Sequence, residues 1–571
     1  MPADHSRPDP HPMIPAPSHL QYHDIPPEST IIAARRHQRR THGRISEFPG
    51  IDQPTARPEP VSADMRSVCD IIGVMNSAVD INSNSAAPGS RLAGSRDSHD
   101  VHDVYDVVVI GAGPAGENVA QYAIRRSGLS AVLVEGGLVG GECSYYACMP
   151  SKALLRPLEV AAATAHLTGL EPARVSVSGL LRRRDKWVSQ YDDAGQVFWA
   201  ASAGIDVIRG WARLNGERRV AVSTPEGNRL LEARHAVVLA TGSQPVVPLE
   251  LQGVHAWGSR DVTAMHEVPG RLIIVGGGAV ACEAATWMSA LGSKVTMLVR
   301  GSRPLSGFEP FASQIVADSL TERGVRILTG ARVTSCERTE ASDRGLGLIH
   351  GGAVRVVCDQ DVLEADEILV STGRRPSLGG VGLDVVGLTA EDVVGGRCPE
   401  WLYAVGDASG QTALTHMGKY QARIVGERIA AHAAGRAPEA VPAGIPVPQV
   451  VFTDPQAAAT GLTQAQARDA GMNIITARVA YISSAGAALL RDDADGEAGL
   501  VVDRATRTIV GATFVGPEAG ELIHAATIAI TAKIPLPLLR HAVPAYPTAS
   551  EIWLRLIESL PSEILRIYFS C

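Results

Sequence analysis

The sequence predicts an α/β protein, because two glycine-rich turns each stand between a β-branched run and a helical stretch. The first turn reads Gly-Ala-Gly-Pro-Ala-Gly at 111–116, and the second reads Gly-Gly-Gly-Ala-Val-Ala at 276–281. A strand, a turn of this kind and a helix form the dinucleotide-binding arrangement of parallel sheets. We therefore expect two Rossmann-like units.

Length and composition allow several domains and exclude some classes of function. The chain has 571 residues, of which 45% are hydrophobic and 20% charged. A net charge of −8 gives no reason to expect nucleic acid binding, and no apolar run reaches the roughly 18–20 residues of a membrane span. Eight cysteines, most of them scattered singly, fit a reducing compartment, so we expect a cytoplasmic protein.

Residues 1–103 are rich in Pro, Ser, Asp, Arg and His and carry no helix or strand period. This composition predicts a disordered N-terminal extension. No apolar stretch follows the start, so a signal peptide is not predicted.

The first dinucleotide unit follows this extension. A strand at 105–110 precedes the turn, a helix runs from 117 to about 127, and a strand from 131 ends at Glu135. Gly111 permits the tight turn, Gly113 lets a pyrophosphate approach backbone N–H groups, and Gly116 lets the helix pack closely on the strand. We expect Glu135 to hold ribose hydroxyls, and the alternative is an ordinary glycine-rich turn. Further cofactor contacts are expected at Pro114, Ala115, Gly141, Ala212, Thr241 and Gly242. Later in this unit, a helical stretch is expected from about residue 180 to 203.

Two cysteines, Cys143 and Cys148, stand between a glycine pair and Lys152. In an unbroken helix their Cα atoms would be about 8.6 Å apart, whereas a disulfide needs roughly 4.4–6.8 Å, so pairing requires a broken turn. Pro150 fits early in a helix, which puts Cys148 near a helix N-terminus that favours its thiolate. Such a pair exchanges two electrons as a disulfide. The alternative is two structural thiols; no second Cys or His pair completes a zinc site, so no metal is predicted.

The second unit lacks the acidic residue at the end of its second strand. Strands are expected at 271–275 and 294–299, around a helix at 282–291. Arg300 and Arg303 follow the second strand instead of an acid, and guanidinium groups suit a 2′-phosphate. We favour NADPH over NADH, and the alternative is a pair of surface arginines. Backbone contacts to this dinucleotide are expected at Gly276, Gly278 and Ala281.

Together these features resemble the class I pyridine nucleotide-disulfide oxidoreductases, which include dihydrolipoyl dehydrogenase, mycothione reductase and mercuric reductase. The matching motifs are the two turns, Gly-Gly-x-Cys-x4-Cys-x-Pro-Ser-Lys at 140–152, Ala-Thr-Gly at 240–242, Thr-Gly-Arg-x-Pro at 372–376 and Gly-Asp at 406–407. The resemblance implies a flavoprotein with FAD and NADPH or NADH, working as a homodimer. Electrons would pass from the nicotinamide through FAD to a Cys143–Cys148 disulfide and on to a disulfide or thiol-bound acceptor.

The resemblance also implies roles for single residues. Cys148 would be the thiol next to the flavin, and Cys143 the thiol that meets the substrate. Lys152 and Glu283 would pair near the flavin ring, and Asp407 would bind the ribitol side of FAD. Further contacts carried over from the motifs are Gly373, Arg374 and Gly406.

The same resemblance divides the chain. We expect the extension at 1–103, an FAD-binding domain at 104–265 with a return segment at 391–444, a nicotinamide-binding domain at 266–390 and an α+β dimerisation domain at 445–571.

One departure falls in the last domain. The resemblance leads us to expect His-Pro-Thr-x-x-Glu, with the His–Glu pair as acid and base, but the chain has Tyr546 before the proline and ends the motif in Glu551. Tyrosine titrates near ~10 and is a poor base at neutral pH. Either Tyr546 or His541 takes the place of the missing histidine.

We interpret the protein as a dihydrolipoyl dehydrogenase-like flavin disulfide reductase. The alternatives are a mercuric-type reductase, a diaphorase for quinone or oxygen, and a non-catalytic flavoprotein redox sensor.

Overall fold

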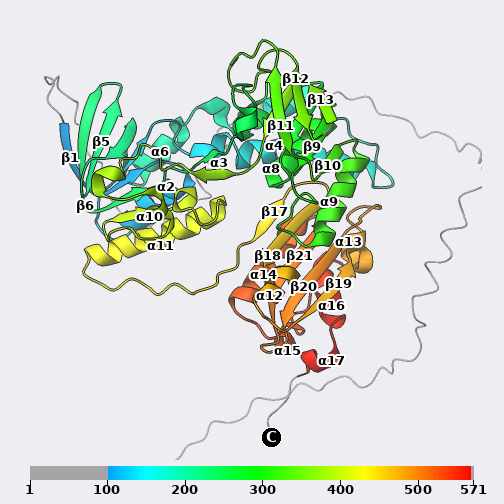
Figure 1. Cartoon of the computed structure of the whole chain (residues 1–571). Helices are drawn as coiled ribbons and strands as arrows, with labels where there is room; N and C mark the ends of the chain where they lie inside the picture. The colour runs from blue at the N-terminus through cyan, green and yellow to red at the C-terminus, as the bar shows by residue number, and fades with distance from the viewer. Residues whose placement is uncertain (1–100, 360, 567–571) are drawn as a thin grey trace, which may run out of the picture. The chain divides into compact units, whose positions relative to one another are not determined.

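The first sheet is built around a strand of fully buried valines. The computed structural model describes residues 101–359 and 361–566. Val107, Val108 and Val109 in β1 are fully buried, as expected for a strand covered on both faces. The seven strands run in the order β3-β2-β1-β6-β5-β4, with β16 paired to β6. They are β1 (Val101–Ile110), β2 (Ala131–Glu135), β3 (Ile205–Arg209), β4 (Trp211–Leu214), β5 (Arg219–Thr224), β6 (Gly227–Leu239) and β16 (Leu402–Ala404) (Figure 1).

Two boundaries differ from the sequence prediction. β1 begins at Val101, so the expected extension to residue 103 is too long, and its remainder lies outside the described residues. The following helix, α2 (Pro114–Ile124), begins earlier than the expected residue 117, because Pro114 occupies its first turn. Helix α11 (Thr415–Ala433) lies beside α2 (Figure 1). A Cβ atom at Gly426 would be 2.8 Å from the carbonyl oxygen of Val119, so the two helices are in close contact.

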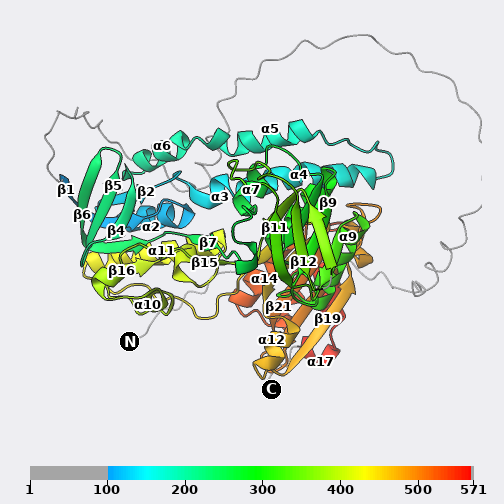
Figure 2. The same ribbon diagram turned by 45° about the horizontal axis from the view of Figure 1, so that its top comes forward.

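The cysteines lie on two separate helices, α3 (Gly141–Tyr145) and α4 (Cys148–Ala165). The long helix expected at about 180–203 is wrong: it is divided into α5 (Val177–Trp187) and α6 (Ala194–Ser202) by η2 (Ser189–Tyr191). All three residues of η2 have positive φ, between 49° and 62°, which a right-handed helix excludes. Helix α5 runs alongside α4 (Figure 2).

The second unit has a four-stranded parallel sheet in the order β10-β9-β8-β14. Its strands are β8 (Arg271–Val275), β9 (Lys294–Val299), β10 (Arg326–Thr329) and β14 (Glu367–Val370), and its helices are α8 (Ala279–Ala290) and α9 (Pro310–Glu322). A separate three-stranded antiparallel sheet contains β11 (Val333–Arg338), β12 (Val354–Cys358) and β13 (Asp361–Ala365). The parallel order is the one expected for a dinucleotide-binding unit.

A two-stranded ribbon lies between the mixed seven-stranded sheet and the parallel four-stranded sheet. β7 (Ser243–Pro245) follows β6 and pairs antiparallel with β15 (Arg374–Pro376), which follows β14. Shorter elements nearby are η3 (Leu249–Leu251), α7 (Ser259–Ala264), η4 (Asp384–Val386), α10 (Ala390–Val394) and η5 (Gly406–Ser409).

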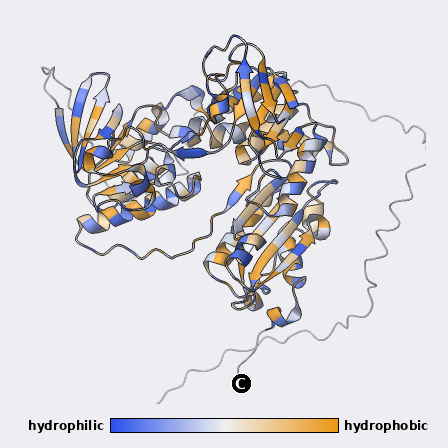
Figure 3. Cartoon of the chain, viewed as in Figure 1, coloured by the Kyte–Doolittle hydropathy of each residue, from blue (hydrophilic) through white to orange (hydrophobic). Residues whose placement is uncertain are grey.

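The C-terminal region is a five-stranded antiparallel sheet in the order β17-β18-β21-β20-β19. Hydrophobic residues follow its strands in Figure 3. The strands are β17 (Gln449–Val451), β18 (Gln456–Gly461), β19 (Ile474–Ala480), β20 (Glu497–Asp503) and β21 (Thr508–Gly516). The helices are α12 (Gln464–Asp469), η6 (Tyr481–Ser483), α13 (Ala485–Ala488), α14 (Ala519–Thr531), α15 (Leu536–Leu539), α16 (Glu551–Glu558) and α17 (Ser562–Leu565). Within the described part of the chain, no helix is long and apolar enough to cross a membrane.

Candidate active site

The first glycine-rich turn is held tightly against the end of β6. Gly111 has a φ of +102°, and a Cβ atom there would lie 2.4 Å from the carbonyl oxygen of Ala240. Both observations require glycine at this position. Glu135, at the end of β2, accepts hydrogen bonds from the N–H groups of Ala112 and Gly137, each at 2.7 Å. The carboxylate is therefore fixed beside the turn, where sequence analysis placed the ribose.

Several polar groups around this turn fit a bound FAD. The hydroxyl of Thr241 is buried and has no hydrogen-bond partner. Ser243 donates to the carboxylate of Asp407, and Arg374 donates to the carbonyl of Ser243 at 2.7 Å. The indole of Trp211 is 76% exposed beside Gly136, which leaves an aromatic face open near Glu135. These residues offer a hydroxyl, carboxylates and a stacking surface to a flavin dinucleotide.

The other residues expected to contact FAD lie around the same turn. Pro114, Ala115 and Gly116 form the first turn of α2, and the backbone N–H groups at such a helix start suit a bound phosphate. A Cβ atom at Gly141 would be 2.8 Å from the Cα atom of Gly113, so the cysteine segment touches the turn. Ala212 lies in β4, and Gly242 and Gly406 follow β6 and β16.

The two cysteines meet across the break between α3 and α4. Both are free thiols in this structure, and Cys148 is the first residue of α4. The hydrogen bond with Cys143, then that with Thr415 and the positive charge of Lys152, lower the pKa of Cys148 to about 6 against the opposing effect of burial. The Sγ atom of Cys148 is 3.3 Å from Oγ1 of Thr415. At neutral pH this arrangement holds Cys148 as the thiolate and Cys143 as the thiol.

Lys152 and Glu283 join the cysteine helix to the second unit. The ammonium group of Lys152 lies 2.8 and 3.0 Å from the two carboxylate oxygens of Glu283 on α8. Glu283 also accepts the backbone N–H of Phe452 at 3.0 Å, and Lys152 lies 4.7 Å from the centre of the Phe452 ring. The pair expected from the resemblance is thus formed between segments far apart in the chain.

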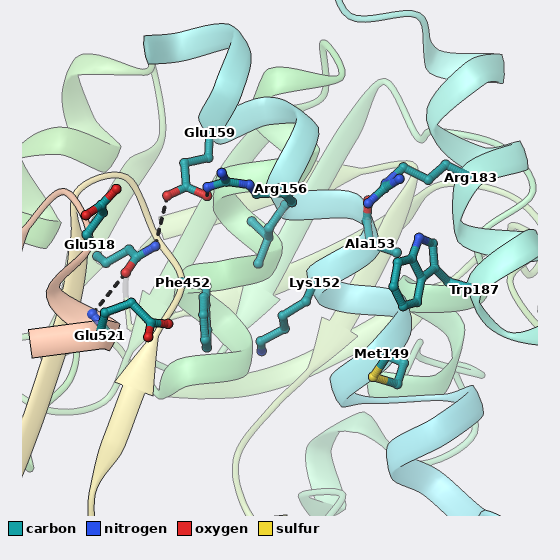
Figure 4. Close-up of a pocket in the computed structure, with 13 residues that line it drawn as sticks. Met149, Lys152, Ala153, Arg156, Glu159, Arg183, Trp187, Phe452, Glu518 and Glu521 are labelled. Atoms are coloured by element: carbon teal, nitrogen blue, oxygen red, sulfur yellow. Dashed lines mark hydrogen bonds and ion pairs between the residues drawn. The ribbon is translucent and has the colours of Figure 1, made fainter. Parts of the chain in front are cut away.

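A pocket of about 580 Å³ opens beside Lys152 (Figure 4). Trp187 and Phe452 line it together with charged groups of Arg156, Glu518 and Glu521. Its size suits a small molecule. The side of α4 that carries Lys152 is therefore open.

The second glycine-rich turn repeats the geometry of the first and differs at the strand end. Gly276 has a φ of +138°, Gly278 directly precedes α8, and Ala281 lies in the first turn of this helix. Arg300 follows β9 and is exposed. Arg303 instead donates to the carbonyls of Ser306 and Phe308, at 3.4 and 3.3 Å. Of the two arginines, Arg300 is the one left open at the strand end.

Gly373 lies before β15 and faces open space. Arg374 donates twice to Ser243, at 2.7 Å each, so it holds the two-stranded ribbon together.

A cluster of charged and aromatic side chains around the redox segment was not predicted from the sequence. Arg260 on α7 pairs with Glu142 and lies 4.7 Å from the ring centre of Tyr146, which stacks on Tyr191 at 5.5 Å. The hydroxyl of Tyr191 is buried without a hydrogen-bond partner. Glu142, the charged residue directly before Cys143, could have indicated this cluster, because a half-buried carboxylate needs a partner.

Tyr546 and Glu551 do not pair with each other within the described residues. The Tyr546 side chain is 78% exposed. Glu551 accepts the backbone N–H of Gly486 at 3.1 Å. His541 is also exposed. The structure of one chain therefore brings none of these three side chains to Cys143.

Comparison with known proteins identifies the family. The family model described as "Pyridine nucleotide-disulphide oxidoreductase" matches residues 105–422, and the model of its dimerisation domain matches residues 447–557. The chain belongs to the pyridine nucleotide-disulphide oxidoreductase family. It is an oxidoreductase, and membership of this family implies FAD and a nicotinamide dinucleotide as cofactors. The dimerisation domain supports a homodimer.

Curated relatives and solved structures cover nearly all of the described chain. Dihydrolipoyl dehydrogenase of Chlamydia muridarum is 31% identical over 464 residues, which are 78% of this chain and 94% of that protein. Dihydrolipoyl dehydrogenase of Chlorobaculum tepidum is 32% identical over 455 residues, with the same shares. The flavoprotein disulfide reductase RclA from Escherichia coli has a TM-score of 0.68 at 25% identity and covers 80% of this chain and 100% of its own. LpdA from Mycobacterium tuberculosis has a TM-score of 0.68 at 24% identity, covering 80% and 99%. These similarities do not favour the mercuric-type, diaphorase or sensor alternatives.

Proposed function

We propose that this member of the family catalyses a dihydrolipoyl dehydrogenase-like reaction, in which two electrons pass between a nicotinamide dinucleotide and a small disulfide or dithiol. The observation that carries the proposal is the cysteine pair: Cys148 begins α4, is held as a thiolate and is hydrogen-bonded to Cys143. The named activity of the similar curated proteins supports a thiol substrate.

The residues divide the chemistry between them. A bound flavin supplies two-electron transfer between the nicotinamide and the cysteine pair. In disulfide reduction, Cys143 attacks one sulfur of the acceptor, the acceptor S–S bond breaks and the first thiolate leaves. Cys148 then attacks Cys143, which releases the second thiolate and closes the Cys143–Cys148 disulfide. The two thiols lose two electrons, the acceptor gains them, and both leaving thiolates take up protons. Lys152 stabilises the negative charge on Cys148.

We assign FAD to residues 104–265 and 391–444, the nicotinamide dinucleotide to 266–390, and dimer formation to 445–571. The exposed guanidinium of Arg300 at the end of β9 favours NADPH over NADH. Tyr546 and Glu551 would then face the partner subunit. The sparse, single cysteines support a cytoplasmic location.

Anaerobic titration of the flavin-loaded protein with NADPH tests the mechanism. The two-electron-reduced protein is expected to show a long-wavelength thiolate-to-flavin absorbance band. Cys148→Ser removes the band and Cys143→Ser retains it, because only Cys148 is assigned to the flavin side. Cys398→Ser, a cysteine outside the site, serves as the matched control. A wild-type protein without the band contradicts the proposal.

An acceptor screen tests the substrate class. We expect kcat/KM to be higher for lipoamide and other small disulfides than for Hg(II) or quinones. Failure to reduce any disulfide would refute the assignment.

A further inference from the structure

The two cysteines lie on helices of very different length. Cys148 begins the 18-residue helix α4, whereas Cys143 lies in α3, a helix of five residues. A helix of this length is not stable on its own, because its few backbone hydrogen bonds do not offset the entropy lost in ordering it. Contacts with the rest of the molecule must therefore fix the position of Cys143.

Helix α7 makes such contacts on both sides of Cys143. Arg260 donates to Oε1 of Glu142, the residue directly before this cysteine, and the nitrogen–oxygen distance is 2.5 Å. The hydroxyl of Thr263 lies 3.0 Å from the carbonyl oxygen of Tyr146, which stands between the two cysteines. The guanidinium group of Arg260 also lies 4.7 Å from the centre of the Tyr146 ring. Helix α7 therefore holds residues 142 and 146 at the same time.

The carboxylate of Glu142 depends on Arg260. The Glu142 side chain is 29% exposed and forms an ion pair with Arg260, and its Oε2 atom is buried without a hydrogen-bond partner. A partly buried carboxylate that loses its positively charged partner is left uncompensated, so it is driven toward water. Removal of the Arg260 guanidinium would therefore displace the short helix that carries Cys143.

Helix α7 is itself fixed near both of its ends. Trp257, two residues before α7, forms two backbone hydrogen bonds of 2.8 Å with β14 of the second unit. Near the other end, the side chain of Arg184 on α5 is 1% exposed and donates to the backbone carbonyls of Thr263 and Met265. These buried contacts make α7 a firm support for the residues that it holds.

Closing a disulfide requires an S–S distance of about 2.05 Å and a narrow range of dihedral angles. A thiol that moves freely must first be ordered, and the lost conformational entropy opposes closure. We propose that Arg260 is a positioning residue for Cys143. By holding the residues on both sides, it keeps the Cys143 thiol placed to close the disulfide with Cys148. This inference rests on the proposed function, because it concerns the closing step of that reaction.

An ion pair that only stabilises the fold is the competing explanation, and a redox equilibrium separates the two. The flavin-loaded protein is equilibrated without oxygen in mixtures of reduced and oxidised dithiothreitol. In closing, the two thiols lose two electrons and two protons, and oxidised dithiothreitol gains them and becomes the dithiol. Trapping with iodoacetamide and peptide mass spectrometry then give the fraction of Cys143 and Cys148 present as thiols. A purely structural pair would leave this fraction unchanged.

The main variant is Arg260→Met. It should lower the equilibrium constant for closing the disulfide by about tenfold, as expected for the loss of a charged hydrogen bond, which raises the reduction potential by about 30 mV. Arg260→Lys keeps the charge without the planar guanidinium and should give a smaller change. Arg271→Met is the matched control, because it removes a partly exposed ion pair of 2.8 Å with Asp366 in the second unit. Its closing constant should equal that of the wild type.

The ring of Tyr146 gives a second, independent comparison. Tyr146→Phe keeps the ring that contacts Arg260 and stacks on Tyr191, so it should behave as wild type. Tyr146→Leu loses both ring contacts and should lower the closing constant, by less than Arg260→Met, because ring contacts contribute less than a charged hydrogen bond. Flavin content confirms that each variant is folded.

An unchanged closing constant in Arg260→Met, or an equal fall in Arg271→Met, would overturn the inference. If Arg260→Met does not retain flavin, the comparison of Tyr146→Leu with Tyr146→Phe decides, and equal closing constants for these two would overturn it. A wild-type protein that lacks the thiolate-to-flavin band or reduces no disulfide would instead refute the proposed function.

Discussion

At both glycine-rich turns the backbone lies so close to a neighbouring carbonyl group that only glycine fits. A Cβ atom at Gly111 would lie 2.4 Å from the carbonyl of Ala240, and one at Gly276 would lie 2.4 Å from the carbonyl of Ser371. In each unit the turn is pressed against the strand that follows later in the chain. The requirement for glycine is thus set by packing of backbone on backbone, whichever dinucleotide is bound.

The residues at the ends of the neighbouring strands differ. Glu135 ends β2, and its carboxylate is fixed by the N–H of Ala112. The exposed Arg300 follows β9. A carboxylate accepts hydrogen bonds from ribose hydroxyls, whereas a guanidinium pairs with a phosphate. We therefore expect the residue at the strand end, and not the turn, to select the nucleotide.

The largest expected effect comes from closing either turn. The side chain introduced by Gly111→Val would overlap the carbonyl oxygen of Ala240 and distort the turn. The protein should therefore purify without flavin. Gly276→Val should keep full flavin content and lose binding of NADPH and NADH. Absorbance at the flavin maximum and nicotinamide fluorescence titration measure the two losses. If Gly276→Val also lost flavin, the turns would not act independently.

The second prediction concerns the ion pair that joins the units. Glu283→Ala removes the partner of Lys152 and the acceptor of the Phe452 N–H group. We expect the free energy of unfolding to fall by about 2 kcal/mol, since a nearly buried carboxylate that accepts charged and backbone donors is lost. Denaturant unfolding of the flavin-loaded protein measures the change. Glu427→Ala on exposed α11 surface should be neutral; an equal loss there would contradict the assignment.

Sequence patterns predicted the parts that depend on neighbouring residues. Local propensity and spacing account for the two turns and for the break between Cys143 and Cys148. They also account for the strands at 131–135 and 294–299. The helix expected at 180–203 was wrong because its apolar period continues through Ser189–Tyr191, and no local signal indicates three positive φ values without glycine.

The contacts of the site could be predicted only in part. The Lys152–Glu283 pair came from the resemblance, since nothing local to either residue indicates the other. The pair between Glu142 and Arg260 was not predicted, because the two residues lie 118 positions apart in the sequence and only tertiary packing brings them together.

The third prediction concerns the charge of the residue at the end of β9. Arg300→Glu introduces an acid like Glu135 and should shift the ratio of kcat/KM for NADPH over NADH by about 10–100-fold toward NADH, as expected for a charged hydrogen bond of 1.5–3 kcal/mol. Arg303→Ala is the matched control, because Arg303 donates to the carbonyls of Ser306 and Phe308. It should change stability more than nucleotide preference. If Arg303→Ala shifted the NADPH/NADH ratio of kcat/KM more than Arg300→Glu does, Arg303 and not Arg300 would select the nucleotide.

The smallest expected effect concerns the pKa of the Cys148 thiol, on which residues of both units act. Lys152 of the first unit lowers the pKa of Cys148, and Glu283 of the second unit raises it. A thiol whose pKa is about 6 is ionised above that pH, so the thiolate-to-flavin band should fade as pH falls through 6. Lys152→Met should move the midpoint upward, leaving less than half of the band at pH 6. Glu283→Gln should move it downward, because the opposing negative charge is gone. Shifts in the same direction for both variants would mean that the ion pair acts on Cys148 through its position and not through its charges.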